Sequence, residues 1–213
     1  MTTTSPQIAE KIYAEGTKRG FHVMDAPVTG GDTGAKAGTL SILVGGEKED
    51  YEACMPLFEA METNINYQGK AGCGQHCKLA NQIMIAGTLS GVCEALTYAK
   101  EQGLDPEVFM KSVATGAAGS KQLDTFGPKI LKDDYAPGFF MKHFIKDMKL
   151  ALIEANRKGL SSDVYYIFFS LLPQPVLLIL NRIFTLPLMY SVWFLPITKN
   201  LSRKDTEISE HRR

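Results

Sequence analysis

The sequence predicts an α/β fold, in which a small sheet with flanking helices is followed by an all-helical part built on a long central helix. Strand and helix periodicities alternate over residues 5–67, which is typical of layered α/β structure. One long pattern of small and apolar residues then runs from Gly74 to Lys100 and stops at Gly103. The segments that follow, up to residue 160, have helical spacing.

The first elements are predicted to be a helix, a strand and a glycine turn. Ser5 suits the N-cap of a helix and Pro6 its first position, and apolar residues at helical spacing continue to Gly20. The apolar run 21–28 is short enough for a strand, and Gly30-Gly31 after it indicates a tight turn.

Residues 38–46 predict a further strand, because their apolar side chains alternate and so share one face: Leu40, Ile42 and Val44. A helix over 48–61 and a strand near 65–67 are expected to follow. Such a sheet has too few strands to be a complete doubly wound domain.

The helical part has its own start and stop signals. Asp105 and Pro106 suit the N-cap and first position of a second helix, and Ser120 could cap a third. Residues 140–158 predict a fourth helix, which Gly159 ends.

The stretch 164–198 is almost continuously apolar, with a single charge at Arg182 and four prolines. A membrane-spanning helix could be drawn through it only by tolerating those prolines, which break helices in water. Two interpretations stay open: a membrane or interfacial segment, and a tail without a folded role. Membrane attachment is the less favoured of the two.

Charge and cysteine content limit the function classes. Lys plus Arg and Asp plus Glu each number 23, so there is no basic surplus to indicate a nucleic-acid partner. The four cysteines lie in helix-like sequence, so we expect reduced thiols in an intracellular compartment. The N-terminus resembles neither a signal peptide nor a transit peptide, which predicts a cytoplasmic location for the chain as written.

Lys78 is the first candidate for chemistry. On a helix it shares a face with Asn81 and Gln82, so an ammonium and an amide would lie together. The lysine could exchange a proton with a substrate hydroxyl that becomes a carbonyl, while the amide orients that hydroxyl. Gly72 and Gly74 would let the backbone approach a ligand at the helix start. The alternative is an ordinary exposed lysine after a glycine turn.

Thr29, Gly30 and Gly31 form the second candidate. A strand that ends in this way exposes backbone N–H groups and a hydroxyl at the edge of the sheet, where they could bind a substrate carboxylate. A plain tight turn explains the same residues.

Two other clusters indicate less. Lys146 belongs to a basic stripe of the fourth helix, and such stripes are usually solvated faces. Cys73, His76 and Cys77 carry donor atoms suited to zinc, but no fourth ligand follows at a convincing spacing. We therefore predict no metal site.

Three segments closely resemble the β-hydroxyacid dehydrogenase family, and in particular its 3-hydroxyisobutyrate dehydrogenase-like members: 25–31, 72–81 and 146–151. The resemblance covers roughly residues 1–160. It implies that residues 1–68 are the C-terminal part of a Rossmann-type NAD(P)-binding domain and that 69–160 form the family's helical domain. Residues 161–213 fall outside the resemblance.

The resemblance also implies an activity, namely the oxidation of a small β-hydroxy acid such as 3-hydroxyisobutyrate by NAD or NADP, a step of valine catabolism. By motif, Lys78 is the catalytic lysine and Asn81 the asparagine that orients the substrate. Thr29, Gly30 and Gly31 correspond to the substrate-carboxylate turn, and Thr3 and Lys146 to cofactor contacts. Family members form oligomers through the helical domain and are mitochondrial in eukaryotes. A homo-oligomer is therefore a further expectation, as is a mitochondrial location if a transit peptide precedes Met1.

Two departures from the family affect these expectations. The family's first strand and glycine fingerprint have no counterpart before Met1, which leads us to expect weak or undetectable cofactor affinity. The chain after Ser161 does not follow the family either. A noncatalytic subunit-association module and a membrane-attached fragment therefore remain alternatives to an active enzyme.

Overall fold

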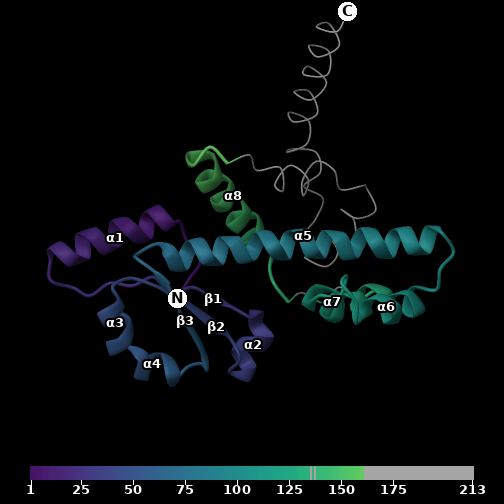
Figure 1. The fold of residues 1–213 in the computed structure, drawn as a ribbon, viewed down its shortest axis with the longest axis horizontal. Helices are drawn as coiled ribbons and strands as arrows, with labels where there is room; N and C mark the ends of the chain where they lie inside the picture. The colour runs from purple at the N-terminus through teal and green to yellow at the C-terminus, as the bar shows by residue number, and fades with distance from the viewer. Residues whose placement is uncertain (135, 137, 161–213) are drawn as a thin grey trace, which may run out of the picture.

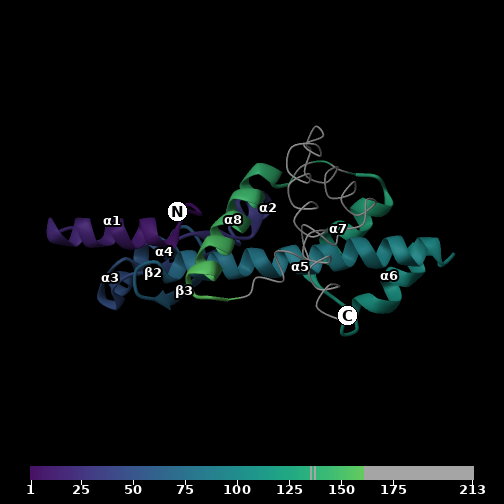
Figure 2. The same cartoon turned by 90° about the horizontal axis from the view of Figure 1, so that it is seen from above.

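The computed structural model describes residues 1–134, 136 and 138–160, apart from the side chain of Met141. Its longest element is α5 (Cys73–Glu101), which runs along most of the molecule (Figure 1). The sheet lies beside the N-terminal half of α5, and two further helices lie beside its C-terminal half (Figure 1, Figure 2). The apolar stretch 164–198 lies outside the described residues, so both interpretations of it stay predictions.

Three strands form the sheet in the order β1-β2-β3: β1 (Val28–Thr29), β2 (Ser41–Gly45) and β3 (Asn64–Gly69). β1 is antiparallel to β2, and β2 is parallel to β3. A short helix that the sequence did not indicate, α2 (Gly31–Ala37), connects β1 to β2. Of the strand predicted over 21–28, the structure forms β1 at its end and an isolated bridge at Asp25.

The strand predicted over 38–46 forms as β2, and it is buried on both faces. Ile42 and Val44 are buried in a cluster with Phe58, as the alternation predicts, but Leu43 between them is also buried. Successive side chains of a strand point to opposite faces, and α5 packs against β2. The sheet is therefore covered on both faces where it meets α5.

The single helix predicted over 48–61 is two helices, α3 (Lys48–Ala53) and α4 (Met55–Glu59), which meet at Cys54. Pro56 accounts for the break, because its ring nitrogen cannot donate the hydrogen bond that would continue α3.

The other predicted helices are confirmed, with bounds shifted by a few residues at most: α1 (Pro6–Lys18), α6 (Pro106–Ala114), α7 (Lys121–Leu131) and α8 (Met141–Arg157). The carboxylate of Asp105 accepts hydrogen bonds from two backbone N–H groups of α6, and the hydroxyl of Ser120 accepts one from α7. These two predicted N-caps therefore stabilise their helices. Ser5 lies at the N-cap of α1 as predicted, but its side chain makes no capping hydrogen bond.

α5 is the core helix of the molecule. It packs against β2, β3, α7 and α8, and its buried Val92 and Leu96 join Leu123 of α7 in a second apolar cluster. In length and composition α5 also meets the requirements of a membrane-spanning helix, and 44% of its most apolar window is buried. Its contacts with the sheet and with two helices are those of a helix at the centre of a folded domain.

Candidate active site

The start of α5 is fixed to the sheet by the buried carboxylate of Asp25. Its two oxygens accept hydrogen bonds from the backbone N–H groups of Gly72, at 2.6 Å, and Gln75, at 2.8 Å. The backbone of Asp25 pairs in turn with Gly45 of β2. A negative charge at a helix N-terminus is favourable, because unpaired N–H groups and the helix dipole both point to it. Asp25 therefore positions the first turn of α5 on the end of the sheet.

Gly74 allows α5 to touch the sheet backbone. A Cβ atom at Gly74 would lie 2.4 Å from the carbonyl oxygen of Leu43, which is closer than carbon and oxygen can approach. The close approach made at Gly74 is therefore to protein backbone, while the predicted approach of a ligand at Gly72 stays a prediction. The helix start meets protein backbone and the carboxylate of Asp25, which takes the place of an anionic ligand there.

Lys78 lies one turn into α5 and is 8% exposed. The alternative of an ordinary exposed lysine is therefore wrong. Burial lowers the pKa of the Lys78 ammonium, the negative charge of Asp147 opposes that shift, and the positive charge of Lys146 adds to it. A lysine with a lowered pKa supplies more of the neutral amine that can accept a proton near neutral pH.

A chain of hydrogen bonds runs from the end of β1 to α8. Thr29 Oγ1 donates to Asn81 Oδ1 at 3.3 Å, Asn81 Nδ2 donates to Gln82 Oε1 at 2.9 Å, and Gln82 Nε2 donates to Asp147 Oδ2 at 2.8 Å. Asp147 and Gln82 are buried. A carboxylate only accepts hydrogen bonds, so each bond of this series donates in the direction of Asp147, where the series ends.

Lys146 and Thr3 lie together. Lys146 Nζ donates to the backbone carbonyl of Thr3 and lies 3.0 Å from Asp147 Oδ1. The contact with Asp147 is an ion pair that lacks hydrogen-bond geometry. Lys146 thus ties the N-terminal segment to α8, at the residue before Asp147, where the network ends.

Gly30 and Gly31 are exposed next to Thr29, where the chain turns from β1 into α2, and their φ angles are 130° and 69°. These angles lie in the region that favours glycine, so the turn reading holds for both residues. Because Thr29 contacts Asn81, the turn also lies at the same end of the sheet as the hydrogen-bonded network.

The N-terminal segment is held from α5 by Gln75, which is 2% exposed. Its side-chain Oε1 accepts from the backbone N–H of Thr4 at 2.9 Å, and its Nε2 donates to the carbonyl of Thr2 at 2.8 Å. Sequence reasoning assigned no role to Gln75, because an isolated glutamine gives no periodic signal. Asp147 could have been singled out, because it shares a face with the buried Phe144 and Ala151.

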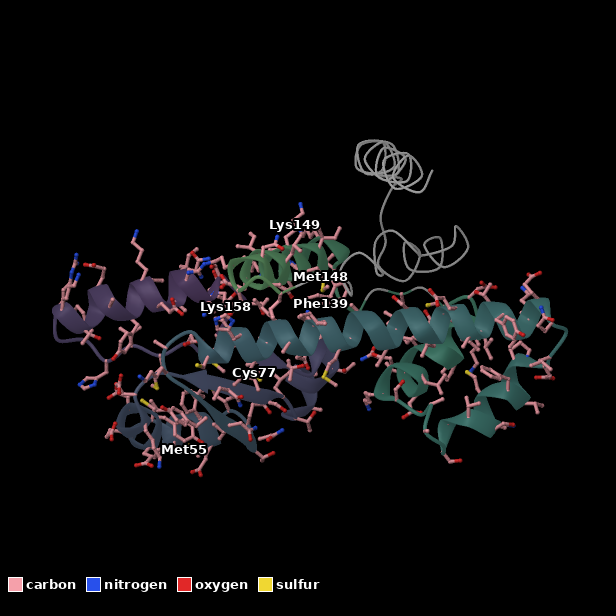
Figure 3. The ribbon with its side chains drawn as sticks, turned by 45° about the horizontal axis from the view of Figure 1, so that its top comes forward. Met55, Cys77, Phe139, Met148, Lys149 and Lys158 are labelled. Atoms are coloured by element: carbon pink, nitrogen blue, oxygen red, sulfur yellow. The ribbon has the colours of Figure 1, made fainter. Side chains whose placement is uncertain are left out.

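Figure 3 shows how α5 lies between two layers. Cys77 lies on the side of α5 that faces the sheet, Met148 lies between α8 and α5, and Lys149 points away from α5. The buried members of the network, Gln82 and Asp147, belong to α5 and α8, which pack against each other. In residues 1–134, 136 and 138–160, no three His, Cys, Asp or Glu side chains gather as metal ligands would.

A hollow of about 390 Å³ lies elsewhere on the surface, and it shares no residue with the network. Three carboxylates line it, so it does not suit an anionic substrate. Its lining residues come from α1, the loop after it and the start of α3: Tyr13, Thr17, Gly20, Phe21, His22, Glu47, Glu49 and Asp50.

Comparison with known proteins assigns the chain to a family. Residues 1–69 match the NAD-binding domain of 6-phosphogluconate dehydrogenase, and residues 72–172 match the NAD-binding domain of NADP-dependent 3-hydroxyisobutyrate dehydrogenase. The chain belongs to the β-hydroxyacid dehydrogenase family. Members of this family are NAD- or NADP-dependent oxidoreductases, and the predicted combination of a Rossmann-type part and a helical part is confirmed.

Several members of the family are similar to this chain. An uncharacterised oxidoreductase of Bacillus subtilis is 54% identical over 159 residues, which are 75% of this chain and 55% of that protein. A probable 3-hydroxyisobutyrate dehydrogenase-like mitochondrial protein of Arabidopsis thaliana is 47% identical over 161 residues, which are 76% of this chain and 48% of that protein. The chain thus spans about half the length of the curated relatives that it matches.

A solved β-hydroxyacid dehydrogenase structure has the same fold. The structure of Mycobacterium tuberculosis 3-hydroxyisobutyrate dehydrogenase with L-serine superposes with a TM-score of 0.73 at 27% identity. The superposition covers 78% of this chain and 60% of the other.

Proposed function

We propose that this chain oxidises a small β-hydroxy acid of the 3-hydroxyisobutyrate type with NAD or NADP, and that Lys78 is its general acid/base. The observation that carries the proposal is the burial of Lys78 beside a hydrogen-bonded network that ends in the buried carboxylate of Asp147. Buried lysines with a shifted pKa that lie among convergent polar groups are typical of functional sites. Membership of the β-hydroxyacid dehydrogenase family supports the same reaction class.

In this proposal Lys78 receives the hydroxyl proton of the substrate. Burial favours the neutral amine, which has a lone pair for that proton. Once the amine is protonated, the negative charge of Asp147 stabilises the ammonium. The two influences on the pKa thus favour the two forms that the lysine adopts in turn.

Asn81 and the turn at the end of β1 hold the substrate. Asn81 Oδ1 already accepts from Thr29, and its second lone pair can accept from the substrate hydroxyl before the proton passes to Lys78. The Thr29 hydroxyl and the backbone N–H groups of Gly30 and Gly31 suit the substrate carboxylate. The hydroxyl would rotate from Asn81 to the carboxylate on binding.

Thr3 and Lys146 suit the nicotinamide end of the cofactor. The Lys146 ammonium retains donor capacity beyond its bond to Thr3. These donors fit a carboxamide oxygen. Lys146 belongs to α8, which packs against α5, the helix that carries Lys78. When bound, the nicotinamide supplies the acceptor for the hydride that leaves the substrate carbon.

The same proposal divides the chain into a Rossmann-type part over residues 1–68, a helical domain over 69–160 and a remainder over 161–213. α5 begins next to the end of β3 and carries Lys78 and Asn81 on its first three turns. The site would therefore lie where the sheet and the helical part meet, which is a preferred place for small-molecule sites.

The test is substrate-dependent reduction of NAD or NADP by the chain and by two variants. Lys78→Ala should reduce turnover by about 10²-fold or more, which is the usual contribution of a general base. Lys100→Ala, an exposed lysine of the same helix, is the matched control and should turn over as the unmodified chain does. Equal turnover in Lys78→Ala would exclude the role assigned to Lys78.

A further inference from the structure

We propose that Gln75 is a positioning residue that fixes the backbone of Thr2, Thr3 and Thr4 beside Lys78, and so sets where Thr3 meets the nicotinamide. This inference rests on the proposed function. We call the segment of Thr2, Thr3 and Thr4 the N-terminal strap.

The side chain of Gln75 binds the strap as a neighbouring strand would. A primary amide carries both a donor and an acceptor, and Gln75 uses one of each on the strap: Oε1 for the N–H of Thr4 and Nε2 for the carbonyl of Thr2. In an extended chain, the carbonyl of one residue and the N–H of the second residue along point to the same side. One side chain can therefore satisfy both groups.

The strap is held from the opposite side as well. The carbonyl of Thr3, which lies between the two bonded residues, accepts from Lys146 of α8. The alternation of partners is the one that an extended backbone requires. The strap is thus fixed between α5 and α8, and Thr3 is its central residue.

Gln75 is itself held rigidly. Its backbone N–H donates to Asp25 at 2.8 Å, and its side chain is almost completely buried. Gln75 and Lys78 are three residues apart on α5, so they lie on adjacent turns of one face. A fixed Gln75 therefore fixes the distance between the strap and the amine of Lys78. The nicotinamide and its substrate must both fit between these two groups.

Gln75 should therefore affect the affinity for the nicotinamide and leave the affinity for the hydroxy acid unchanged. Asn81, which we assign to the acid, belongs instead to the hydrogen-bonded chain that runs from Thr29 to Gln82. Loss of the Gln75 amide should loosen Thr3 while Lys78 keeps its place on the helix.

The first experiment measures hydrogen exchange at the backbone N–H of Thr4 in the full chain. Gln75→Leu keeps the approximate volume and removes both hydrogen bonds, so we expect exchange at Thr4 to become at least about tenfold faster. Gln75→Glu keeps an acceptor for Thr4 and loses the donor for Thr2. Exchange at Thr4 in this variant should therefore be faster than in the unmodified chain and slower than in Gln75→Leu. Gln102→Leu, at the exposed end of α5, is the matched control and should exchange as the unmodified chain does.

The second experiment measures binding of reduced nicotinamide mononucleotide and of 3-hydroxyisobutyrate to the same chains. We expect Gln75→Leu to weaken the nucleotide by about tenfold or more and to change the affinity for the acid by less than about twofold. A purely structural role would weaken both ligands together.

The outcomes separate the inference from the proposed function. Unchanged exchange at Thr4 in Gln75→Leu overturns the inference, as does an unchanged affinity for the nucleotide. If the unmodified chain binds the nucleotide and the NMR signals of Thr3 do not change, the proposed cofactor contact of Thr3 is wrong. That result does not depend on how Gln75 acts on the strap. Faster exchange together with selective loss of nucleotide affinity supports both.

Discussion

Gln82 donates its side-chain amide to the carboxylate of Asp147 at 2.8 Å, and only 2% of Gln82 and 1% of Asp147 are exposed. This buried bond joins α5 to α8 behind Lys78. Because the carboxylate can only accept, Gln82 must turn its amide oxygen to Asn81, and Asn81 must turn its own oxygen to Thr29. One carboxylate on α8 therefore sets the orientation of an amide that we assign to the substrate.

The same carboxylate also acts on the pKa of Lys78, which gives a prediction about pH. Burial lowers the pKa of Lys78 below its ordinary value of 10.5, and Asp147 raises it. Oxidation of a hydroxy acid needs the neutral amine, so turnover should rise with pH through that pKa. Asp147→Asn removes the charge that favours the ammonium, so the inflection of the pH profile should move to lower pH.

Titration of turnover against pH checks this shift, and Asp124→Asn on the exposed face of α7 serves as its control. An inflection at higher pH in Asp147→Asn would show that Asp147 does not stabilise the ammonium.

The hydroxyl of Thr29 should matter more than its methyl group. Thr29→Ser keeps the hydroxyl, which donates to Asn81 in the free chain and to the substrate carboxylate in the proposed complex, so we expect KM for the hydroxy acid to change by less than about threefold. Thr29→Val keeps the shape and removes the hydroxyl, so KM should rise by about tenfold or more. Steady-state kinetics on the pair distinguishes the two groups, and equal KM values would remove Thr29 from the substrate site.

The carboxylate of Asp25 should contribute to the stability of the fold. Asp25→Asn leaves one of the two N–H groups at the start of α5 without an acceptor, so the free energy of unfolding should fall by about 1–3 kcal/mol. Urea unfolding measures the change. Asp32→Asn, whose side chain is about half exposed, is the control and should change stability by less than about 0.5 kcal/mol.

Gly74 and Gly87 should respond oppositely to the same substitution. Gly74→Ala would place Cβ against the backbone of Leu43, so we expect a loss of about 1–3 kcal/mol or more. A Cβ at Gly87 meets nothing within 4 Å, so Gly87→Ala should stabilise α5 by about 0.5–1 kcal/mol. Thermal unfolding of both variants checks the pair, and similar effects would show that α5 does not lie against β2 as described.

Much of the fold was predictable because its signals are local. Caps such as Asp105 and Ser120 and the long apolar pattern of α5 specify helices without reference to the rest of the chain. The burial of Leu43 was not predictable from alternation, since it depends on α5 packing from the other face. The single helix expected over 48–61 could have been divided, because Pro56 was visible in the sequence.

The candidate site was predictable in its residue types but not in its connections. Helical spacing placed Lys78 and Asn81 on one face, and the family resemblance added Thr3 and Lys146. The bonds of Gln75 to the strap and of Gln82 to Asp147 join residues 65 or more positions apart in the sequence. No periodicity reports such contacts, so the roles of Gln75, Asp25 and Asp147 came from the structure.

Chemical rescue tests most directly the claim that the amine of Lys78 moves the substrate proton. Lys78→Ala removes the amine and leaves space for a small one, so added ethylamine should restore hydroxy-acid-dependent reduction of NAD or NADP in proportion to its concentration. The rescued rate should follow the neutral fraction of ethylamine as pH is varied. If Lys78→Ala still binds the hydroxy acid and ethylamine restores no turnover, Lys78 is not the acid/base of this site.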